Sequence, residues 1–348
     1  MLGILRYVAS KEAQTGANLM FAIEEPEAFL HPQTQRAMAK IIGDIADDAQ
    51  VLVTTHSSVL VDSFDISRIA RLPLQSGGTT YERSKPVLDP TDAGRLSRYC
   101  SAANSELVFA NAVVFVEGEG DYSVVERLLS RACAAPGGHY ALGVTVIEAG
   151  GVGKIQYLVQ LANVFGIRSY VIVDGDAVRT AGSGKREVLN ILASRHQQPS
   201  KAERDSIMQQ ADQASTTASQ AFANQKKLNH LLSPFDVFVL SSDLEGLFLD
   251  ALGVAGVVAA LGPGRDGSID ASFASTLSTA PDAYEQLASW MGSRGWNSNR
   301  KKSGKLEPHL APYLLDDCLA LGDPLPMALQ PLVTWLEQII ASVRHAPV

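Results

Sequence analysis

Short apolar runs alternate along this chain with segments that have the apolar spacing of amphipathic helices. The runs Ala112–Val116, 170–173 and 237–240 have the length and the β-branched content of buried strands. Between the first two lies segment 154–164, whose apolar positions are Ile155, Leu158, Leu161 and Ala162. This order predicts an α/β fold with a mostly parallel sheet flanked by helices.

Acidic residues follow each of these three strands. Glu117 follows the first, an Asp-Gly-Asp triplet follows the second, and an acidic pair follows the third. A glycine turn at 118–120 separates Glu117 from Asp121, which we expect to open a helix. The carboxyl ends of parallel strands meet at one edge of a sheet. The sequence therefore predicts one acidic edge, formed by Glu117, Asp121, Asp174, Asp176, Asp243 and Glu245.

Carboxylates gathered in this way repel each other unless a cation neutralises them. Oxygen ligands select Mg²⁺ or Mn²⁺, and the strand ends carry no His or Cys that would indicate zinc. Gly175 is expected to let the backbone turn so that Asp174 and Asp176 reach one centre. Two ions roughly 3.5–4 Å apart could clamp a phosphodiester for hydrolysis.

The first part of the chain has a similar pattern with a different chemistry. Segment 18–23 reads as a strand that ends in Glu24 and Glu25, a helix is predicted at 33–47, and the strand Gln50–Thr54 is followed by His56. One acid could hold Mg²⁺, the next could orient water, and His56 could touch a γ-phosphate. The alternative is an ordinary βαβ unit with polar strand ends.

The phosphate-binding loop GxxxxGK[ST] is missing from the sequence. The segment 150–155, GGVGKI, lacks the leading glycine and has Ile155 where Ser or Thr is needed, and segment 182–186 fails the same test. We therefore do not expect this chain alone to bind ATP.

Two further segments interrupt the alternation. Segment 181–232, rich in Gln, Ser and Ala, is predicted to be a helical insertion in which a pair of helices forms a hairpin, with a partly disordered loop as the alternative. Segment 294–305 carries five cations and a tryptophan, namely Arg294, Trp296, Arg300, Lys301, Lys302 and Lys305. Its cations could contact phosphates and its tryptophan could stack on a base. The alternative is a solvated loop.

Segment 72–91 is predicted to be a short strand with loops that links two domains.

Composition narrows the class of protein. The 348 residues suffice for about two domains, 46% of them are hydrophobic, and the net charge of −8 disfavours a protein that coats nucleic acid by charge alone. No uncharged apolar run is long enough to predict a membrane span, and no signal-peptide pattern opens the chain. Three cysteines far apart indicate a reducing compartment, so we expect a cytoplasmic protein.

The first part of the chain resembles the second half of an ABC-type ATPase head, as found in the SMC/Rad50 and OLD (overcoming lysogenisation defect) families. The resemblance makes Glu24 the Walker B acid, Glu25 the catalytic glutamate, Glu27 part of the D-loop and His56 the switch histidine. The ABC signature and Walker A loop of such heads are missing here. A truncated product is therefore expected, and ATP would bind only with the missing upstream half.

The second part resembles a Toprim domain, and the order of the two parts resembles OLD-family nucleases. Glu117 matches a glutamate that is a general base or metal ligand, and Asp174 with Asp176 match the DxD motif. The resemblance also makes Asp121 the family's second acid, and Asp243 with Glu245 its later acidic pair. It makes Lys305 the family's downstream lysine, with Lys302 as the alternative. It implies a partial ATPase segment at 1–95 and a Toprim nuclease domain at 96–348.

The resemblance implies a Mg²⁺- or Mn²⁺-dependent DNA endonuclease that uses two ions, is regulated by its ATPase domain and acts in phage defence. The expected partners are DNA and a second copy of the chain, as a homodimer or a higher homo-oligomer, with no membrane. The alternative is a non-catalytic module that binds DNA or supports assembly. A topoisomerase or primase would need a tyrosine-nucleophile or zinc-binding domain, and the sequence shows neither.

Overall fold

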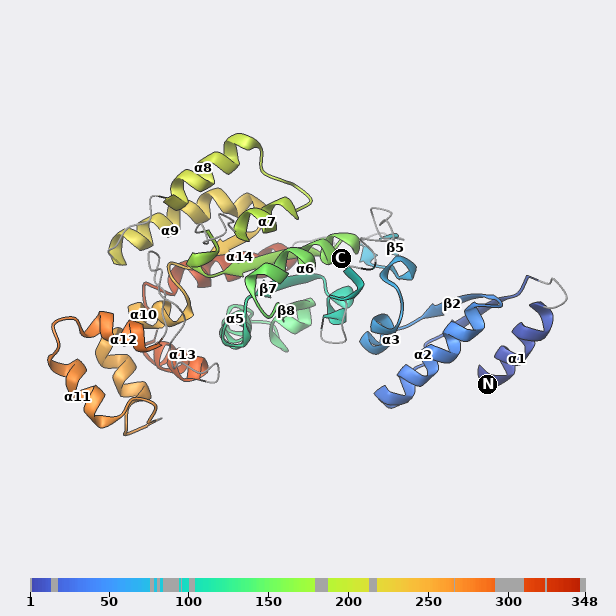
Figure 1. Cartoon of the computed structure of the whole chain (residues 1–348), viewed down its shortest axis with the longest axis horizontal. Helices are drawn as coiled ribbons and strands as arrows, with labels where there is room; N and C mark the ends of the chain where they lie inside the picture. The colour runs from blue at the N-terminus through green and yellow to red at the C-terminus, as the bar shows by residue number, and fades with distance from the viewer. Residues whose placement is uncertain are drawn as a thin grey trace. The chain divides into compact units, whose positions relative to one another are not determined.

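The fold was analysed in a computed structural model of the chain (Figure 1). The structure describes residues 2–13, 18–75, 78–79, 82–83, 94, 96–99, 104–178, 187–212, 218–265, 267–291, 310–322 and 324–344. Two compact units emerge, one made chiefly of Met1–Ala110 and the other of Asn111–Asn163 together with Arg168–Pro347. The domain boundary near residue 95 stays a prediction.

The first unit is built on a strand–helix–strand unit. Strands β1 (Met20–Glu24) and β2 (Gln50–Thr54) pair in parallel, and α2 (Pro32–Ala46) connects them. The helix buries Met38, Ala39, Ile42 and Ile45, and α1 (Leu2–Ala13) packs against it. Because parallel neighbours need a crossover connection, the spacing of the two apolar runs was sufficient to predict this arrangement.

The rest of the first unit consists of short elements. They are α3 (Ser58–Ser63), the 3₁₀ turns η1 (Ile66–Arg68) and η2 (Ser105–Phe109), and two small antiparallel ladders. One ladder pairs β3 (Ala70–Arg71) with β6 (Glu82–Arg83), and the other pairs β4 (Leu74–Gln75) with β5 (Gly78–Thr79). The sequence predicted only one short strand here, because two-residue ladders are too short to show an alternating pattern.

The second unit contains a four-stranded parallel sheet in the order β10-β9-β7-β8. Its strands are β7 (Ala112–Val116), β8 (Val144–Glu148), β9 (Arg168–Val173) and β10 (Val237–Val239). Every residue of β7 is buried, as expected for an inner strand covered on both faces. The predicted mostly parallel α/β fold is confirmed.

Helices complete the core of this unit. α5 (Glu119–Ala132) follows β7, and α6 (Val152–Val164) follows β8. The residues of β7 at 112, 114 and 116 share one hydrophobic cluster with α5 and with α14 (Gln330–Arg344). The 3₁₀ turns η3 (Gly138–Leu142), η4 (Gly175–Val178) and η5 (Ser233–Phe235) lie next to the strand ends.

A further group of helices follows β10. They are α10 (Leu244–Leu261), α11 (Ala271–Thr279), α12 (Ala283–Met291) and α13 (Ala311–Ala320). Among the described residues, α10 is the one helix long and apolar enough to cross a membrane. It bends at Gly253, where φ is 68°, and it packs against α12 and α13 with Phe248 and Leu249 fully buried. Eight of its 18 residues are buried in the core.

The predicted helical insertion contains α7 (Glu187–Ala193), α8 (Lys201–Asp212) and α9 (Ala218–Leu232), so it has three described helices rather than a pair. These helices lie together in Figure 1, in yellow-green to yellow. α9 runs beside β10, where Asn229 donates to the Val239 carbonyl at 2.9 Å and accepts from the Val239 amide at 2.8 Å. The side chain of Asn229 thus replaces a neighbouring strand at the edge of the sheet.

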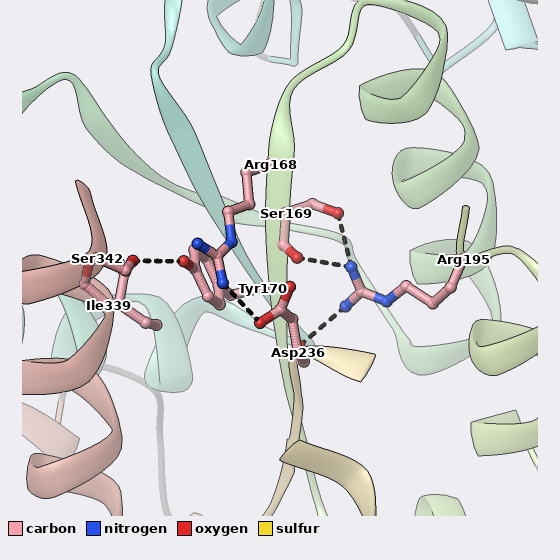
Figure 2. Close-up of polar contacts among 7 residues, drawn as sticks. All are labelled: Arg168, Ser169, Tyr170, Arg195, Asp236, Ile339 and Ser342. Carbon is pink, nitrogen blue, oxygen red and sulfur yellow. Dashed lines mark hydrogen bonds and ion pairs between the residues drawn. The ribbon is translucent and has the colours of Figure 1, made fainter. Parts of the chain in front are cut away.

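A buried arginine joins the end of α7 to the amino-terminal edge of the same sheet (Figure 2). Arg195 donates to the Ser169 carbonyl at 2.6 Å, to the Ser169 hydroxyl at 2.8 Å and to the Asp236 carbonyl at 2.9 Å. Burial lowers the pKa of Arg195 to about 10, so its guanidinium stays charged at neutral pH. This clamp fixes the starts of β9 and β10 next to each other.

Replacing Arg195 with methionine should therefore destabilise the chain strongly. Ser169 and Asp236 would lose the hydrogen bonds from the guanidinium, although the Val171 amide would still donate to the Asp236 carbonyl. We expect the free energy of unfolding to fall by about 2–4 kcal/mol in urea titrations. Arg168→Met is the matched control, because its guanidinium makes a solvent-exposed ion pair with Asp236 at 3.3 Å. That variant should lose about 1 kcal/mol or less. Equal losses in the two variants would contradict this role of Arg195.

Asn229→Ala should also destabilise the chain, because it leaves the amide of Val239 unpaired at the edge of the sheet and leaves its carbonyl with the Gln225 side chain, at 3.1 Å, in place of two side-chain donors. We expect a loss of about 1–3 kcal/mol in the free energy of unfolding. Gln209→Ala, at an exposed position of α8, is the control and should change it by less than about 0.5 kcal/mol. A stability equal to wild type for Asn229→Ala would show that water replaces the two lost hydrogen bonds.

Candidate metal centre at the carboxyl edge of the sheet

Glu117 is held in place from two sides at the end of β7. Its side-chain Oε1 accepts a hydrogen bond from the Asp174 amide at 2.9 Å, and its own carbonyl accepts one from the Gly151 amide at 2.8 Å. These bonds connect the ends of β7, β8 and β9. The carboxylate of Glu117 is therefore fixed by the strand end of β9, and its backbone is fixed by the loop after β8.

The turn after Glu117 brings Asp121 back to the strand end. Gly118 caps α5, and the Asp121 Oδ2 accepts a hydrogen bond from the Gly118 amide at 3.1 Å. The helix begins at Glu119, two residues before the predicted start at Asp121. The predicted start lay too far along the chain because a glycine cap has no side chain that would indicate it. An acid can stand anywhere in the first turn, so it does not fix the first residue of a helix.

The Asp-Gly-Asp triplet forms a 3₁₀ turn after β9. The Gly175 amide donates to the carbonyl of Ser242, which ties this turn to the segment after β10. Gly175 does not belong to the glycines with positive φ. The expected turn is present and brings Asp174 and Asp176 to one centre, and its 3₁₀ backbone has an ordinary conformation.

Three carboxylates converge at this edge. One oxygen each of Glu117, Asp174 and Asp176 lies within 4.8 Å of the other two. The Oδ1 of Asp174 is shielded from solvent and accepts no hydrogen bond within the described part of the chain. An unpaired buried carboxylate oxygen is costly unless a proton or a cation compensates for it.

The electrostatics of Asp174 reflect this crowding. Burial raises the pKa of Asp174 well above its usual range, and repulsion from Glu117, Asp121, Asp243 and Glu245 raises it further. The structure thus places the predicted acids near one another, as expected for strand ends at one edge. It does not place them all in the same tight cluster.

Asp243 and Glu245 lie at the start of α10. Asp243 is buried, and its Oδ1 accepts a hydrogen bond from the Gly246 amide at 3.0 Å, so it caps the helix. The helix begins at Leu244, directly after this cap. The cap occupies one oxygen of Asp243.

The acids of the first unit form a separate arrangement. Glu24 ends β1 opposite Thr54, and Glu25 follows with a φ of 39°. The His56 Nε2 lies 3.3 Å from the Glu25 Oε1. The Glu27 Oε1 accepts from the His56 amide at 2.9 Å and from the Thr55 hydroxyl. The structure thus brings together Glu25 and His56, as their positions after paired parallel strands predict.

Comparison with known proteins finds family models that match two parts of the chain. Residues 108–176 match the model of the overcoming lysogenization defect protein-like TOPRIM domain, and residues 1–61 match that of an AAA ATPase domain. The chain is related to the OLD family. The OLD-like Toprim match covers Glu117, Asp121, Asp174 and Asp176, and the ATPase match covers Glu24, Glu25, Glu27 and His56.

Curated relatives carry nuclease names. The chain is 29% identical over 162 residues to the OLD nuclease of Thermus scotoductus, covering 44% of this chain and 30% of the relative. It is 21% identical over 226 residues to the Old nuclease of Escherichia phage P2, covering 60% and 35%. It is 26% identical over 190 residues to the Endonuclease GajA of Bacillus cereus, covering 54% and 31%. The chain thus spans about a third of the length of these relatives.

A solved structure also aligns with part of the chain. The C-terminal region of the Xanthomonas campestris pv. campestris OLD protein aligns with 68% of this chain and 98% of its own, with 15% identity and a TM-score of 0.40.

The acidic cluster of the OLD-like Toprim domain fits a divalent cation. All its donors are carboxylate oxygens, which hard cations prefer, and one of them is buried without a partner. The metal roles of Asp121, Asp243 and Glu245 stay predictions. The predicted lysines and the basic segment lie outside the described residues: Arg294, Trp296, Arg300, Lys301, Lys302 and Lys305.

Sequence reasoning overlooked one part of this edge. Segment 150–154 was treated only as a failed phosphate-binding loop, yet its Gly151 amide bonds to Glu117. Gly150 and Gly151 have φ values of 67° and 122°, which explains why glycine stands at both positions. Two glycines directly after an apolar strand with a terminal acid were the signal that could have placed this loop at the site.

Asp174→Asn should stabilise the chain in the absence of metal. Because the pKa of Asp174 is raised in the folded state, its ionisation opposes folding, and wild-type stability falls as pH rises above the unfolded pKa near 3.8. The stability advantage of the variant should therefore grow between pH 4 and 8 in EDTA. Asp205→Asn, which removes an exposed charge on α8, should show no such trend.

Added Mn²⁺ should reverse this order, because an ion that binds only the folded state raises its stability. We expect the melting temperature of wild type to rise with Mn²⁺ and that of Asp174→Asn to stay nearly constant. An equal rise in both proteins would place the ion elsewhere.

Proposed function

We propose that this chain carries the catalytic part of a metal-dependent DNA endonuclease. The observation that carries the proposal is the cluster of Glu117, Asp174 and Asp176 at the carboxyl edge of the parallel sheet. The OLD-like Toprim match and the nuclease names of three relatives support it. The substrate is duplex DNA, and the ions are Mg²⁺ or Mn²⁺.

The chain's own carboxylates have distinct tasks in this proposal. Glu117, Asp174 and Asp176 hold one ion, and Asp121, Asp243 and Glu245 supply ligands for a second. When bound, such ions lower the pKa of water and stabilise negative charge on a phosphodiester. The bond between the Asp174 amide and Glu117 orients the Glu117 carboxylate before any ion arrives, so little rearrangement is needed.

Hydrolysis then requires a water oxygen to bond to phosphorus while the bond from phosphorus to one sugar oxygen breaks. The proton lost by the water goes to solvent or to Glu117, and the leaving oxygen takes up a proton. Lys305, or Lys302 as the alternative, stabilises the negative charge of the transition state. The basic segment with Arg294, Trp296, Arg300 and Lys301 contacts the DNA backbone and bases.

The ATPase part of the chain regulates the nuclease in this proposal. Glu24, Glu25 and His56 complete a nucleotide site only when an upstream half supplies the phosphate-binding loop. The 3.3 Å contact between His56 and Glu25 supports this role, because it places the acid that would orient water next to the histidine that would touch a γ-phosphate. The full assembly is a homodimer or a higher homo-oligomer.

Cleavage of supercoiled plasmid tests the proposal directly. Wild type should convert the plasmid to nicked and linear forms in Mg²⁺ or Mn²⁺ and leave it intact in EDTA. Glu117→Ala and Asp174→Ala should each lower the cleavage rate by about 100-fold or more, because they remove groups that stabilise the transition state. Asp205→Ala, on the exposed face of α8, should cleave at the wild-type rate.

The same assay separates the proposal from its alternative, a non-catalytic module that binds DNA. Binding without cleavage in any metal, with the upstream half restored, would support that alternative. Cleavage by Glu117→Ala and Asp174→Ala at the wild-type rate would show that the site is misplaced.

A further inference from the structure

The acidic edge contains one cation among the described segments that follow its four strands. Segments 117–121, 149–154, 174–178 and 240–246 together hold seven carboxylates, but Lys154 is their single lysine or arginine. This balance repels DNA, because the polyanion must approach an edge that is itself negative. A cation in this position therefore has a strong effect on the local field.

The glycine loop holds Lys154 close to the cluster. The Lys154 amide donates to the Gly151 carbonyl at 3.0 Å, and the Gly151 amide donates to the Glu117 carbonyl at 2.8 Å, so two successive hydrogen bonds connect Lys154 to Glu117. The side chain turns back over the loop, where its Nζ lies 3.1 Å from the position that a Cβ on Gly150 would occupy. A glycine at 150 leaves room for this ammonium group.

Lys154 is also available for a ligand. Its side chain is exposed, and no carboxylate forms an ion pair with it within the described part of the chain. A lysine that merely neutralised the acids would lie against one of them. The ammonium group instead remains free to meet an anion that approaches the cluster from solvent.

We propose that Lys154 contacts a backbone phosphate of the DNA strand beside the metal centre. The inference rests on the proposed nuclease function and adds a substrate contact from the loop 150–154. A lysine binds phosphate as a compact point charge without reading the base, so the contact holds the strand irrespective of sequence.

The salt dependence of DNA binding tests this contact. The affinity of wild type and Lys154→Ala for a labelled duplex is measured by fluorescence anisotropy in EDTA at several salt concentrations. Loss of one phosphate contact should lower the slope of log K against log salt by about 0.9. The same contact predicts a five- to tenfold weaker affinity, roughly, at 0.1 M salt, equal for duplexes of different sequence.

Two further variants control for net charge and for the lysine itself. Lys40→Ala, on the exposed surface of α2, removes the same charge and should leave the slope unchanged. Lys154→Arg keeps the charge and should keep the slope. Mn²⁺ affinity should stay equal or increase in Lys154→Ala, because the change removes a cation near carboxylates, and a decrease would show a structural role and overturn the inference.

The outcomes separate this inference from the proposed function. An unchanged slope in Lys154→Ala, with a wild type that binds and cleaves DNA, overturns the inference and leaves the nuclease standing. A wild type that neither binds nor cleaves DNA, even with the upstream half restored, would contradict both the proposed nuclease function and this inference.

Discussion

Repulsion among carboxylates at one edge of a parallel sheet is the constraint on which this part of the molecule depends. Parallel strands deliver their carboxyl ends to the same edge, so three acids meet within 4.8 Å. The fold tolerates this because backbone amides hold Glu117, and because the hydrophobic core beneath supplies the stabilising free energy. Part of the stability of the domain is thus exchanged for a site that attracts a cation.

The order of the strands explains why the site needs so many long-range contacts. Glu117 and Asp174 are 57 residues apart, and the turn at Gly175 reaches the segment after β10 through Ser242. Each connection fixes one strand end relative to the next. At the opposite edge Arg195 performs the corresponding task for the starts of β9 and β10. Hydrogen bonds therefore fix the strands of the sheet at both their carboxyl and their amino ends.

Much of this architecture could be predicted from the sequence. The strands Gln50–Thr54 and Ala112–Val116 have the predicted bounds. For Ala112–Val116 the reason is that buried strands of parallel sheets are continuous apolar runs with abrupt polar ends. The convergence of Glu117, Asp174 and Asp176 followed from the same rule. Helix starts were less accurate, since Gly118 gives no capping signal and Asp243 was interpreted only as a ligand.

The contacts that the sequence could not predict are those made by polar side chains across long separations. Nothing in the local pattern distinguishes Arg195 from a surface arginine, because its partners lie 26 and 41 residues away. Lys154 was likewise assigned only to a failed motif, since the proximity of its loop to Glu117 depends on strand pairing. Such roles depend on tertiary structure.

Asn229 has a consequence for how copies of this chain can associate. Parallel sheets often grow at an open edge, where one chain lends a strand to another and forms a continuous sheet across two molecules. At Val239 both backbone groups are already taken by a side chain from α9. A neighbouring copy would have to displace that helix before it could extend the sheet past β10. Self-association that preserves this fold must therefore use a different surface.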